Sequence, residues 1–423
     1  MRNFYCSRMA ITCVRVLAAI LVIAYCFIQA YAGGDFQIYM GAAELLREGK
    51  NCYNVWIYLG VDDYCGYSYS PLFAIFLIPF TFFPYPTAQV LWLFANLFFL
   101  YRLFKIIRWY LPLSSLTTKQ YRLWVILSVI LTSRFVLNNF EMVQMTIFLL
   151  YCCLEATYQL KNNKYILSGI LISVGIIVKI MPIIMIPYFL YRKQIKPVII
   201  AVVCLIVFLF LPVIIYGWEF NKLLLTDWWN IINFNNPELV YDNGEGIHSL
   251  SGFITTYFTD AGKRDILYRS TIIVLQKDIF PIVLNGGRLF FICMTLYFLK
   301  FPPFIKSRTK LHTLWELSYI FCITPLIFPH QQKYAFFFIA PAILYVIYFL
   351  IFSYNRIVFS RNTNTLMWLL IVLYFILAIL TTDGIIGRHL SYISQHYKTI
   401  TVGTFLMIIV LSACHPKRLN PDK

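Results

Sequence analysis

Apolar stretches long enough to cross a lipid bilayer recur along the whole chain. A transmembrane α-helix needs about 20 predominantly apolar residues. Such stretches lie at 10–31, 87–107, 122–138, 143–160, 197–216, 283–299, 312–328, 335–353, 365–382 and 398–414. The pattern predicts an all-α integral membrane protein with about ten full transmembrane helices.

A further apolar segment, residues 165–191, is interrupted by Lys179, Pro182 and Pro187. One straight helix would place the basic residues before and after it on opposite sides of the membrane. A break near Lys179–Pro182 would instead form a re-entrant pair of half-helices with both ends on one side. Non-helical turns at membrane depth are tolerated where they line a cavity enclosed by protein. We therefore expect a broken re-entrant helix pair here.

The charged residues then orient the predicted bundle. With the pair broken, every short loop on one side is rich in Lys and Arg, as cytoplasmic loops are. Both termini are expected in the cytoplasm, and a bacterial cytoplasmic membrane is the expected location. The formal net charge of +17 follows from these loops. No basic run is long enough for a nucleic-acid patch, so no nucleic-acid partner is expected.

Polar residues on the other side concentrate in two long loops, about 32–86 and 217–282. The segment after Asp35 places Ile38, Ala42 and Leu45 on one helical face, which predicts an amphipathic helix lying at the outer surface. Two long loops over a helical bundle are typical of a roofed reaction chamber. The absence of repeats and linkers favours one domain over residues 1–423.

Composition agrees with a membrane protein and narrows the chemistry. The chain is 60% hydrophobic and 13% charged, too apolar for a soluble protein of 423 residues. It contains no nucleotide-binding or zinc motif, so we expect neither a cofactor nor a metal. Cys52 and Cys65 share one outer loop and are candidates for a disulfide if that loop faces an oxidising compartment.

Asp35 is the first acid of the chain and follows the first predicted span. One interpretation is a helix N-cap for the amphipathic segment that follows it. The other is a general base, or a carboxylate that orients an acceptor hydroxyl, at the membrane boundary. The two roles are compatible.

Several other polar side chains lie at predicted membrane boundaries or inside the apolar hairpin. Lys179 is a cation within that hairpin, where a charge usually faces a cavity, although it could also extend to the interface. The others are either ligands for a phosphate or a sugar, or ordinary polar groups of loops and span ends: His248, Ser249, His330, Lys333, Glu141 and Gln144.

In order along the chain, these segments resemble glycosyltransferase family 87, a family of the GT-C superfamily of polytopic membrane glycosyltransferases. The resemblance rests on Asp35 after the first span, "LLREGKNCYN", "YSPLFAIFLIPF" from Tyr69, "MVQMT", "LSGILISVGIIVKIMPIIMIPYF" and "GIHSLSG". In "VQMT" the chain departs from the Gly and Asn of the family's "GQ-x-N" pattern. In "GIHSL" it departs from the family's Asn-Gln.

The resemblance implies a GT-C-type bundle and an inverting transfer of a mannose-like hexose on the outer membrane face. The donor would be a polyprenyl-phosphate-linked sugar, the acceptor a glycan or glycolipid, and membrane lipids the surrounding partners. Asp35 would be the general base. Lys179, His248, Ser249, His330 and Lys333 would bind donor phosphate or sugar, with Tyr69, Glu141 and Gln144 lining the cavity. The alternative is a transporter or flippase of a lipid-linked or anionic glycan, without bond chemistry.

Overall fold

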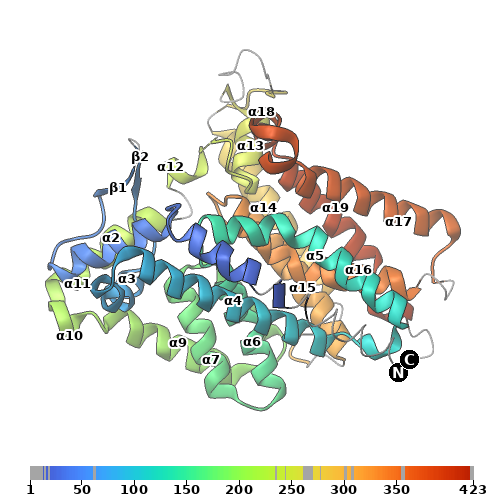
Figure 1. Ribbon diagram of the computed structural model, residues 1–423, viewed down its shortest axis with the longest axis horizontal. Helices are drawn as coiled ribbons and strands as arrows, with labels where there is room; N and C mark the ends of the chain where they lie inside the picture. The colour runs from blue at the N-terminus through green and yellow to red at the C-terminus, as the bar shows by residue number, and fades with distance from the viewer. Residues whose placement is uncertain are drawn as a thin grey trace.

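The computed structural model describes residues 13, 16–17, 20–60, 63–233, 236–242, 244–260, 270–276, 278–299, 303–305, 309–353 and 358–419. Both termini and part of the predicted first span lie outside these residues. The structure is a bundle of helices with one small hairpin of strands (Figure 1). The α-helices are α2 (Phe36–Arg47), α3 (Pro71–Leu77), α4 (Tyr85–Tyr110), α5 (Thr118–Glu141), α6 (Thr146–Lys161), α7 (Tyr165–Val178), α8 (Met185–Tyr191), α9 (Ile195–Phe210), α10 (Val213–Tyr216), α11 (Trp218–Ile232), α12 (Pro237–Val240), α13 (Leu250–Phe258), α14 (Ile279–Phe298), α15 (Lys310–Ile327), α16 (Ala340–Ser353), α17 (Arg361–Tyr374), α18 (Asp383–His396) and α19 (Thr399–Ala413). Short 3₁₀ or π-helical pieces complete it: η1 (Ile78–Phe82), η2 (Leu113–Ser115), η3 (Met181–Ile184), η5 (Lys333–Ile339), η6 (Phe375–Leu380) and η7 (Pro416–Leu419).

Within the described residues, six helices are long and apolar enough to cross a membrane, or seven if the bent pair α18–α19 forms one span. The all-α membrane class is therefore confirmed, whereas the predicted count of ten spans is not. The predicted spans at 143–160 and 312–328 do coincide with helices, α6 and α15. However, α6 has only 16 residues and α15 contains charged groups.

Successive long helices run in alternate directions between two ends of the bundle. Gln89, near the start of α4, donates to the backbone oxygen of Gly33 (3.1 Å). At the opposite end, Gln120 near the start of α5 donates to the backbone oxygen of Ile351 at the end of α16 (3.4 Å). We call the end with Gly33, α2 and α13 the loop end. The end with the α6–α7 and α8–α9 turns is the hairpin-base end.

The predicted break in residues 165–191 is present. Helix α7 ends at Val178, Lys179 has an extended backbone (φ −149°, ψ 134°), and η3 and α8 lead the chain back. Tyr165 and Arg192, at the two outer ends of the segment, line the same pocket. The chain therefore reverses at Lys179, because Pro182 has no N–H with which to continue helix α7.

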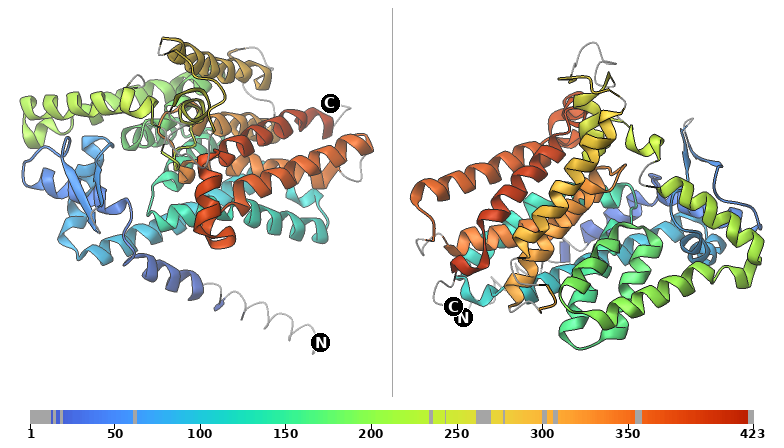
Figure 2. Two further views of the ribbon diagram at one scale, coloured as in Figure 1. Left: turned by 90° about the horizontal axis from the view of Figure 1, so that it is seen from above. Right: turned by 180° about the vertical axis from the view of Figure 1, so that it is seen from behind.

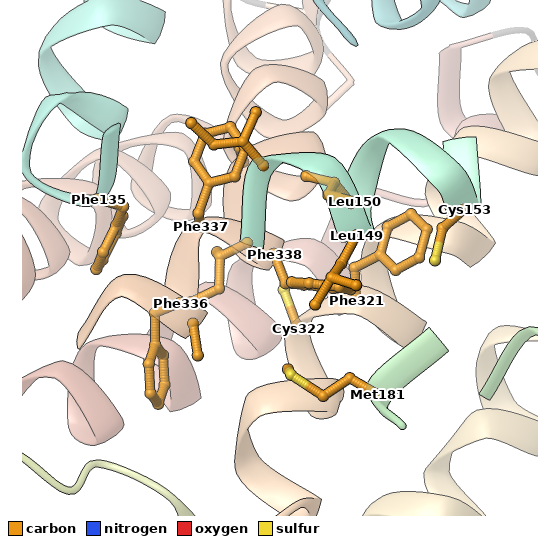
Figure 3. Close-up of a cluster of buried hydrophobic side chains, with 14 of the residues drawn as sticks. Phe135, Leu149, Leu150, Cys153, Met181, Phe321, Cys322, Phe336, Phe337 and Phe338 are labelled. Atoms are coloured by element: carbon orange, nitrogen blue, oxygen red, sulfur yellow. The ribbon is translucent and has the colours of Figure 1, made fainter. Parts of the chain in front are cut away.

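The centre of the bundle is an apolar core beneath the loop end. Residues 333–353 are almost completely buried, with 94% of the apolar window inside the protein. Phe336, Phe337 and Phe338 of η5 lie among side chains of α5, α6, η3 and α15 (Figure 3). Helix α15 is also buried along its length. A helix surrounded by protein can carry polar groups if they find partners there, which explains why α15 is less apolar than a lipid-facing span.

The main polar contact of α15 is an ion pair with the turn after α8. Arg192 donates from Nη2 to Glu316 Oε1 (2.6 Å) and from Nε to Oε2 (3.0 Å), and both side chains are buried. Tyr188 donates to the same carboxylate (3.0 Å). This contact fixes the re-entrant pair to the central helix.

Replacing Arg192 by Met is expected to lower the free energy of unfolding by about 3–5 kcal/mol, because Glu316 would remain buried without its cation. Thermal unfolding of the purified protein measures the effect. The double variant Arg192→Met with Glu316→Met should recover much of the loss. If the single variant proved as stable as the double variant, burial of Glu316 without Arg192 would not destabilise the protein.

The loop end also contains the two strands, which the sequence analysis did not predict. Strand β1 (Trp56–Gly60) pairs antiparallel with β2 (Asp63–Gly66). The hairpin packs on α2 at Gly41, where an added Cβ would lie 2.7 Å from Ile57. The amphipathic helix predicted after Asp35 is α2, and α11 is a second one in the other long loop. Figure 2 shows the strands and both helices gathered in one part of the molecule.

Candidate active site

Asp35 directly precedes helix α2 and contacts the turn between α5 and α6. Its backbone N–H donates to the carbonyl oxygen of Met142 (3.0 Å). Gly34 has φ +126°, and an added Cβ there would lie 3.0 Å from the Met142 backbone. Only glycine allows so close an approach with this backbone conformation. The Gly33–Gly34 pair thus brings Asp35 against the α5–α6 turn.

The carboxylate of Asp35 accepts a hydrogen bond from Nε2 of Gln144, which is fully buried. The amide oxygen of Gln144 lies 3.1 Å from the hydroxyl of Tyr39 and 3.4 Å from that of Tyr69. These two hydroxyls are 3.0 Å apart. Because hydroxyls donate to the amide oxygen, the amide nitrogen must face the carboxylate. The two tyrosines therefore orient Gln144, and Gln144 orients Asp35.

The role of Asp35 as a helix cap is wrong. Asp35 occupies the N-cap position of α2, but its side chain makes no capping hydrogen bond. Its carboxylate is directed to Gln144 instead and stays partly exposed. The carboxylate is therefore accessible for a role other than holding the helix.

Lys179 brings a cation to the same place from the break of the re-entrant pair. Its ammonium lies 5.3 Å from the ring centroid of Tyr69 and 5.6 Å from that of Tyr334. Contacts of this kind stabilise a cation through the ring quadrupole. Tyr69 also donates to Gln144, the partner of Asp35, so the cation lies next to the hydrogen-bond network that holds the carboxylate. The site thus combines one carboxylate and one cation, each held by aromatic or amide groups.

The turn that presents Gln144 contains a strained residue. Val143 has φ +49°, a left-handed conformation that is unusual for a β-branched side chain. The turn closes helix α5 through hydrogen bonds from Val143 N to Phe140 O (3.3 Å) and from Gln144 N to Asn139 O (2.8 Å). Val143 stands where the family pattern noted above has Gly. The residue before Gln144 must adopt a left-handed conformation in this turn, and glycine adopts that conformation without strain.

Replacing Val143 by Gly is expected to change stability by no more than about 1 kcal/mol. Relief of roughly 1–2 kcal/mol of backbone strain offsets the lost burial of the side chain. Val143→Ala loses two buried methyl groups, about 1.6 kcal/mol, yet keeps most of the strain. Thermal unfolding should therefore rank Gly above Ala at this position. The opposite ranking would mean that strain at Val143 is negligible.

A second polar cluster forms where the other long loop meets the turn after α15. The backbone N–H of His248 donates to Gln331 O (2.8 Å), next to an isolated bridge between Ile247 and Gln332. Nδ1 of His330 lies 2.7 Å from the carboxylate of Asp242. The structure thus brings together His248, Ser249, His330 and Lys333, which the sequence analysis singled out separately.

His248 is completely buried, and neither ring nitrogen has a hydrogen-bond partner among the described residues. Burial, followed by the positive charges of Lys398, Arg134 and Lys333, holds the pKa of His248 well below its usual value. The imidazole is therefore neutral at pH 7. A buried ring without partners is the kind of group that a bound polar ligand or a water satisfies.

The remaining candidates have more local roles. Ser249 caps α13 by accepting from the backbone N–H of Gly252 (3.4 Å). Glu141 is exposed at the end of α5 and accepts from Asn138 (3.2 Å). Cys52 is buried and Cys65 lies on β2, and their pairing stays a prediction.

The two clusters adjoin through consecutive residues of η5. Tyr334 contacts Lys179, and its backbone oxygen accepts from Asn139 (3.0 Å), while Lys333 acts electrostatically on His248. The sequence analysis missed Tyr39, Tyr334 and the partner of His330, Asp242. No group of three His, Cys, Asp or Glu side chains suited to a metal ion occurs among the described residues.

Apolar helices of membrane length, with a carboxylate and a cation at one end of the bundle, define a multi-pass membrane protein with a polar cluster at that end. Residues 67–274, just under half of the chain, match the model of glycosyltransferase family 87, and this match supports a glycosyltransferase of membrane type. The family resemblance of the sequence is thereby confirmed. The matched region contains Tyr69, Gln144 and Lys179. No curated protein and no solved structure matches the chain.

Proposed function

We propose that the protein transfers a mannose-like hexose from a polyprenyl-phosphate-linked donor to a glycan or glycolipid acceptor, with inversion at the anomeric carbon. The observation that carries the proposal is that Asp35 and Lys179 are linked through Gln144 and Tyr69 at one end of a bundle of apolar helices. A base and a cation are the two groups that an inverting transfer from a phosphate leaving group requires. The family match supports sugar transfer as the reaction class.

In this reaction the acceptor hydroxyl oxygen forms a bond to the anomeric carbon of the donor sugar. The bond from that carbon to the phosphate oxygen breaks, and its electron pair leaves with the polyprenyl phosphate. Asp35 takes the proton of the acceptor hydroxyl, and Lys179 stabilises the charge on the departing phosphate. Gln144 keeps the carboxylate of Asp35 in one orientation through its own hydrogen bonds to Tyr39 and Tyr69.

The second cluster would bind the sugar or the phosphate beyond Lys179. Its candidates are His248, His330 and Lys333, supported by their position next to Tyr334. The neutral ring of His248 can donate from one nitrogen and accept at the other, which suits a sugar hydroxyl. Ser249 would act indirectly, since its hydroxyl caps α13.

The charge distribution supports the proposed location. Lys161, Lys164 and Arg192 all lie at the hairpin-base end, and the acids Asp35 and Asp242 lie at the loop end. By the tendency of basic residues to remain inside, the loop end faces outward and both termini are cytoplasmic. We place the protein in a bacterial cytoplasmic membrane, with the reaction at the outer face.

A panel of polyprenyl-phosphate sugars, each incubated with purified protein and a membrane glycolipid extract, tests the function. We expect one donor to be consumed, with the sugar appearing on an acceptor and free polyprenyl phosphate released. A flippase would move the lipid-linked sugar across a vesicle membrane while leaving it intact. Intact donor, with transbilayer movement, would therefore favour that alternative.

A further inference from the structure

Helix α11 presents a stripe of exposed aromatic side chains at the loop end. Trp218, Lys222, Leu225 and Trp229 follow one another at the spacing that places residues on one face of a helix. Trp218 is 55% exposed and Trp229 is 61% exposed. We call these four residues the α11 stripe. Together with Phe210 at the end of α9, they line a hollow of about 290 Å³.

The rest of α11 divides into a buried side and a polar side. Asn221 and Leu224 are almost completely buried against the protein. Glu219, Thr226 and Asn230 are exposed, and they lie on the other flank of the stripe. The stripe therefore separates the protein from a polar surface. Exposed aromatic residues beside a polar helix face are typical of a helix that lies in the plane of a membrane surface.

The α11 stripe continues an apolar surface of α9. Helix α9 is part of one of the apolar spans, and only 17% of the apolar window of that span is buried inside the protein. Ile199 and Ile206 on this helix are each more than half exposed. A helix of membrane length with so little protein around it is surrounded by lipid chains. Phe210, 45% exposed, ends α9 and stacks on Trp218, with ring centroids 5.8 Å apart. The lipid that covers α9 therefore extends to the stripe.

The composition of the stripe suits the boundary at which the lipid chains end. Tryptophan rings concentrate at the level of the headgroups, because most of the ring is apolar and its N–H is polar. Lys222 is the only charged member of the stripe. Its stem can lie along apolar surface while its ammonium extends to the phosphate layer. The stripe thus matches the headgroup layer better than the interior of the bilayer.

We propose that the α11 stripe lies in the phospholipid headgroup layer at the loop end and anchors the long loops to the membrane. Trp218 and Trp229 insert between the headgroups, and phospholipid chains fill the hollow beside Phe210. The polar flank of α11 faces the water.

Two hydrogen bonds transmit this anchoring to the first long loop. The hydroxyl of Tyr216 donates to the backbone oxygen of Leu46 (2.8 Å), and the amide of Asn51 donates to the carboxylate of Asp227 on α11 (2.7 Å). Leu46 belongs to α2, and α2 begins directly after Asp35. Contact between α11 and the membrane therefore also fixes the height of Asp35 relative to the headgroups.

Fluorescence quenching of the full-length protein in phosphatidylcholine vesicles tests the placement. Bromine atoms on the acyl chains quench tryptophans that lie in lipid, and iodide on both sides of the membrane quenches tryptophans that lie in water. The emission lost in the double variant Trp218→Phe with Trp229→Phe isolates the stripe. Phe keeps an aromatic ring at each position, so the fold should persist. We expect this emission to be quenched most by bromine near the headgroups, less by bromine near the chain ends, and least by iodide.

Trp56→Phe is the matched control, since Trp56 is an exposed tryptophan of β1 outside the stripe. The emission that it removes should be quenched mainly by iodide. Two results would overturn the proposal. Quenching of the stripe by iodide, as for Trp56, would mean that the stripe faces water and is free for a glycan or a protein. Strongest quenching by bromine near the chain ends would place α11 in the bilayer interior. The vesicles contain no sugar donor, so the result is independent of the proposed reaction.

Discussion

Asp35→Asn should lower the rate of sugar transfer at least about 100-fold, the lower range for loss of a general base. Asn has nearly the same shape as Asp and keeps an oxygen that can accept from Gln144, but it cannot take the acceptor proton. The unfolding temperature should remain near that of the wild type, because the side chain does not cap α2. Transfer from the active donor and thermal unfolding, measured on the same preparation, give both quantities.

Glu44→Gln is the matched control for this substitution. Glu44 is an exposed acid on the same helix, and its variant should keep full activity. Full activity in Asp35→Asn would exclude Asp35 as the base. A large fall in stability would show that the carboxylate is needed for folding.

Lys179→Met should weaken donor binding roughly 10- to 100-fold, the effect of losing one charge-assisted contact to a phosphate. The Met side chain keeps most of the apolar length of Lys, so packing between Tyr69 and Tyr334 should persist. Titration of purified protein with the polyprenyl-phosphate sugar measures the dissociation constant. Binding of a glycolipid acceptor should change much less.

The control is Lys105→Met, which removes an exposed lysine of α4. Its donor affinity should equal that of the wild type. An unchanged dissociation constant in Lys179→Met would mean that Lys179 does not contact the donor phosphate. In that case Lys333 would be the next cation to test.

Asp35 and Lys179 could be predicted because each breaks a local rule, whereas Tyr69 and Gln144 were expected near them from the family resemblance. Lys179 is a cation within an apolar segment, and Pro182 prevents that segment from being one helix. Asp35 is an acid directly after a predicted span. These conflicts between residue type and surroundings are visible in a single sequence, and the structure places Asp35, Tyr69, Gln144 and Lys179 together.

The site residues that could not be predicted do not conflict with their surroundings in the sequence. Tyr39 and Tyr334 are two of 31 tyrosines in an aromatic-rich chain, and only the packing of α2 and η5 distinguishes them. The Asp242–His330 pair joins residues 88 positions apart, which no local pattern reveals. The predicted count of ten spans is not confirmed for a related reason. Helix α15 is surrounded by protein, so partners within the fold decide its composition.

The hydrogen bond from Asn139 to the backbone oxygen of Tyr334 has a consequence for the order in which the protein folds during synthesis. Tyr334 lies 299 residues after Asp35 in the chain, and the second cluster also needs Thr401, which donates to the backbone oxygen of His248 (2.6 Å). During synthesis Asp35 and Gln144 are therefore present long before Tyr334 and the second cluster. A ribosome-bound chain can therefore insert most of its helices before the two polar clusters are complete, and they are assembled only near the end of translation.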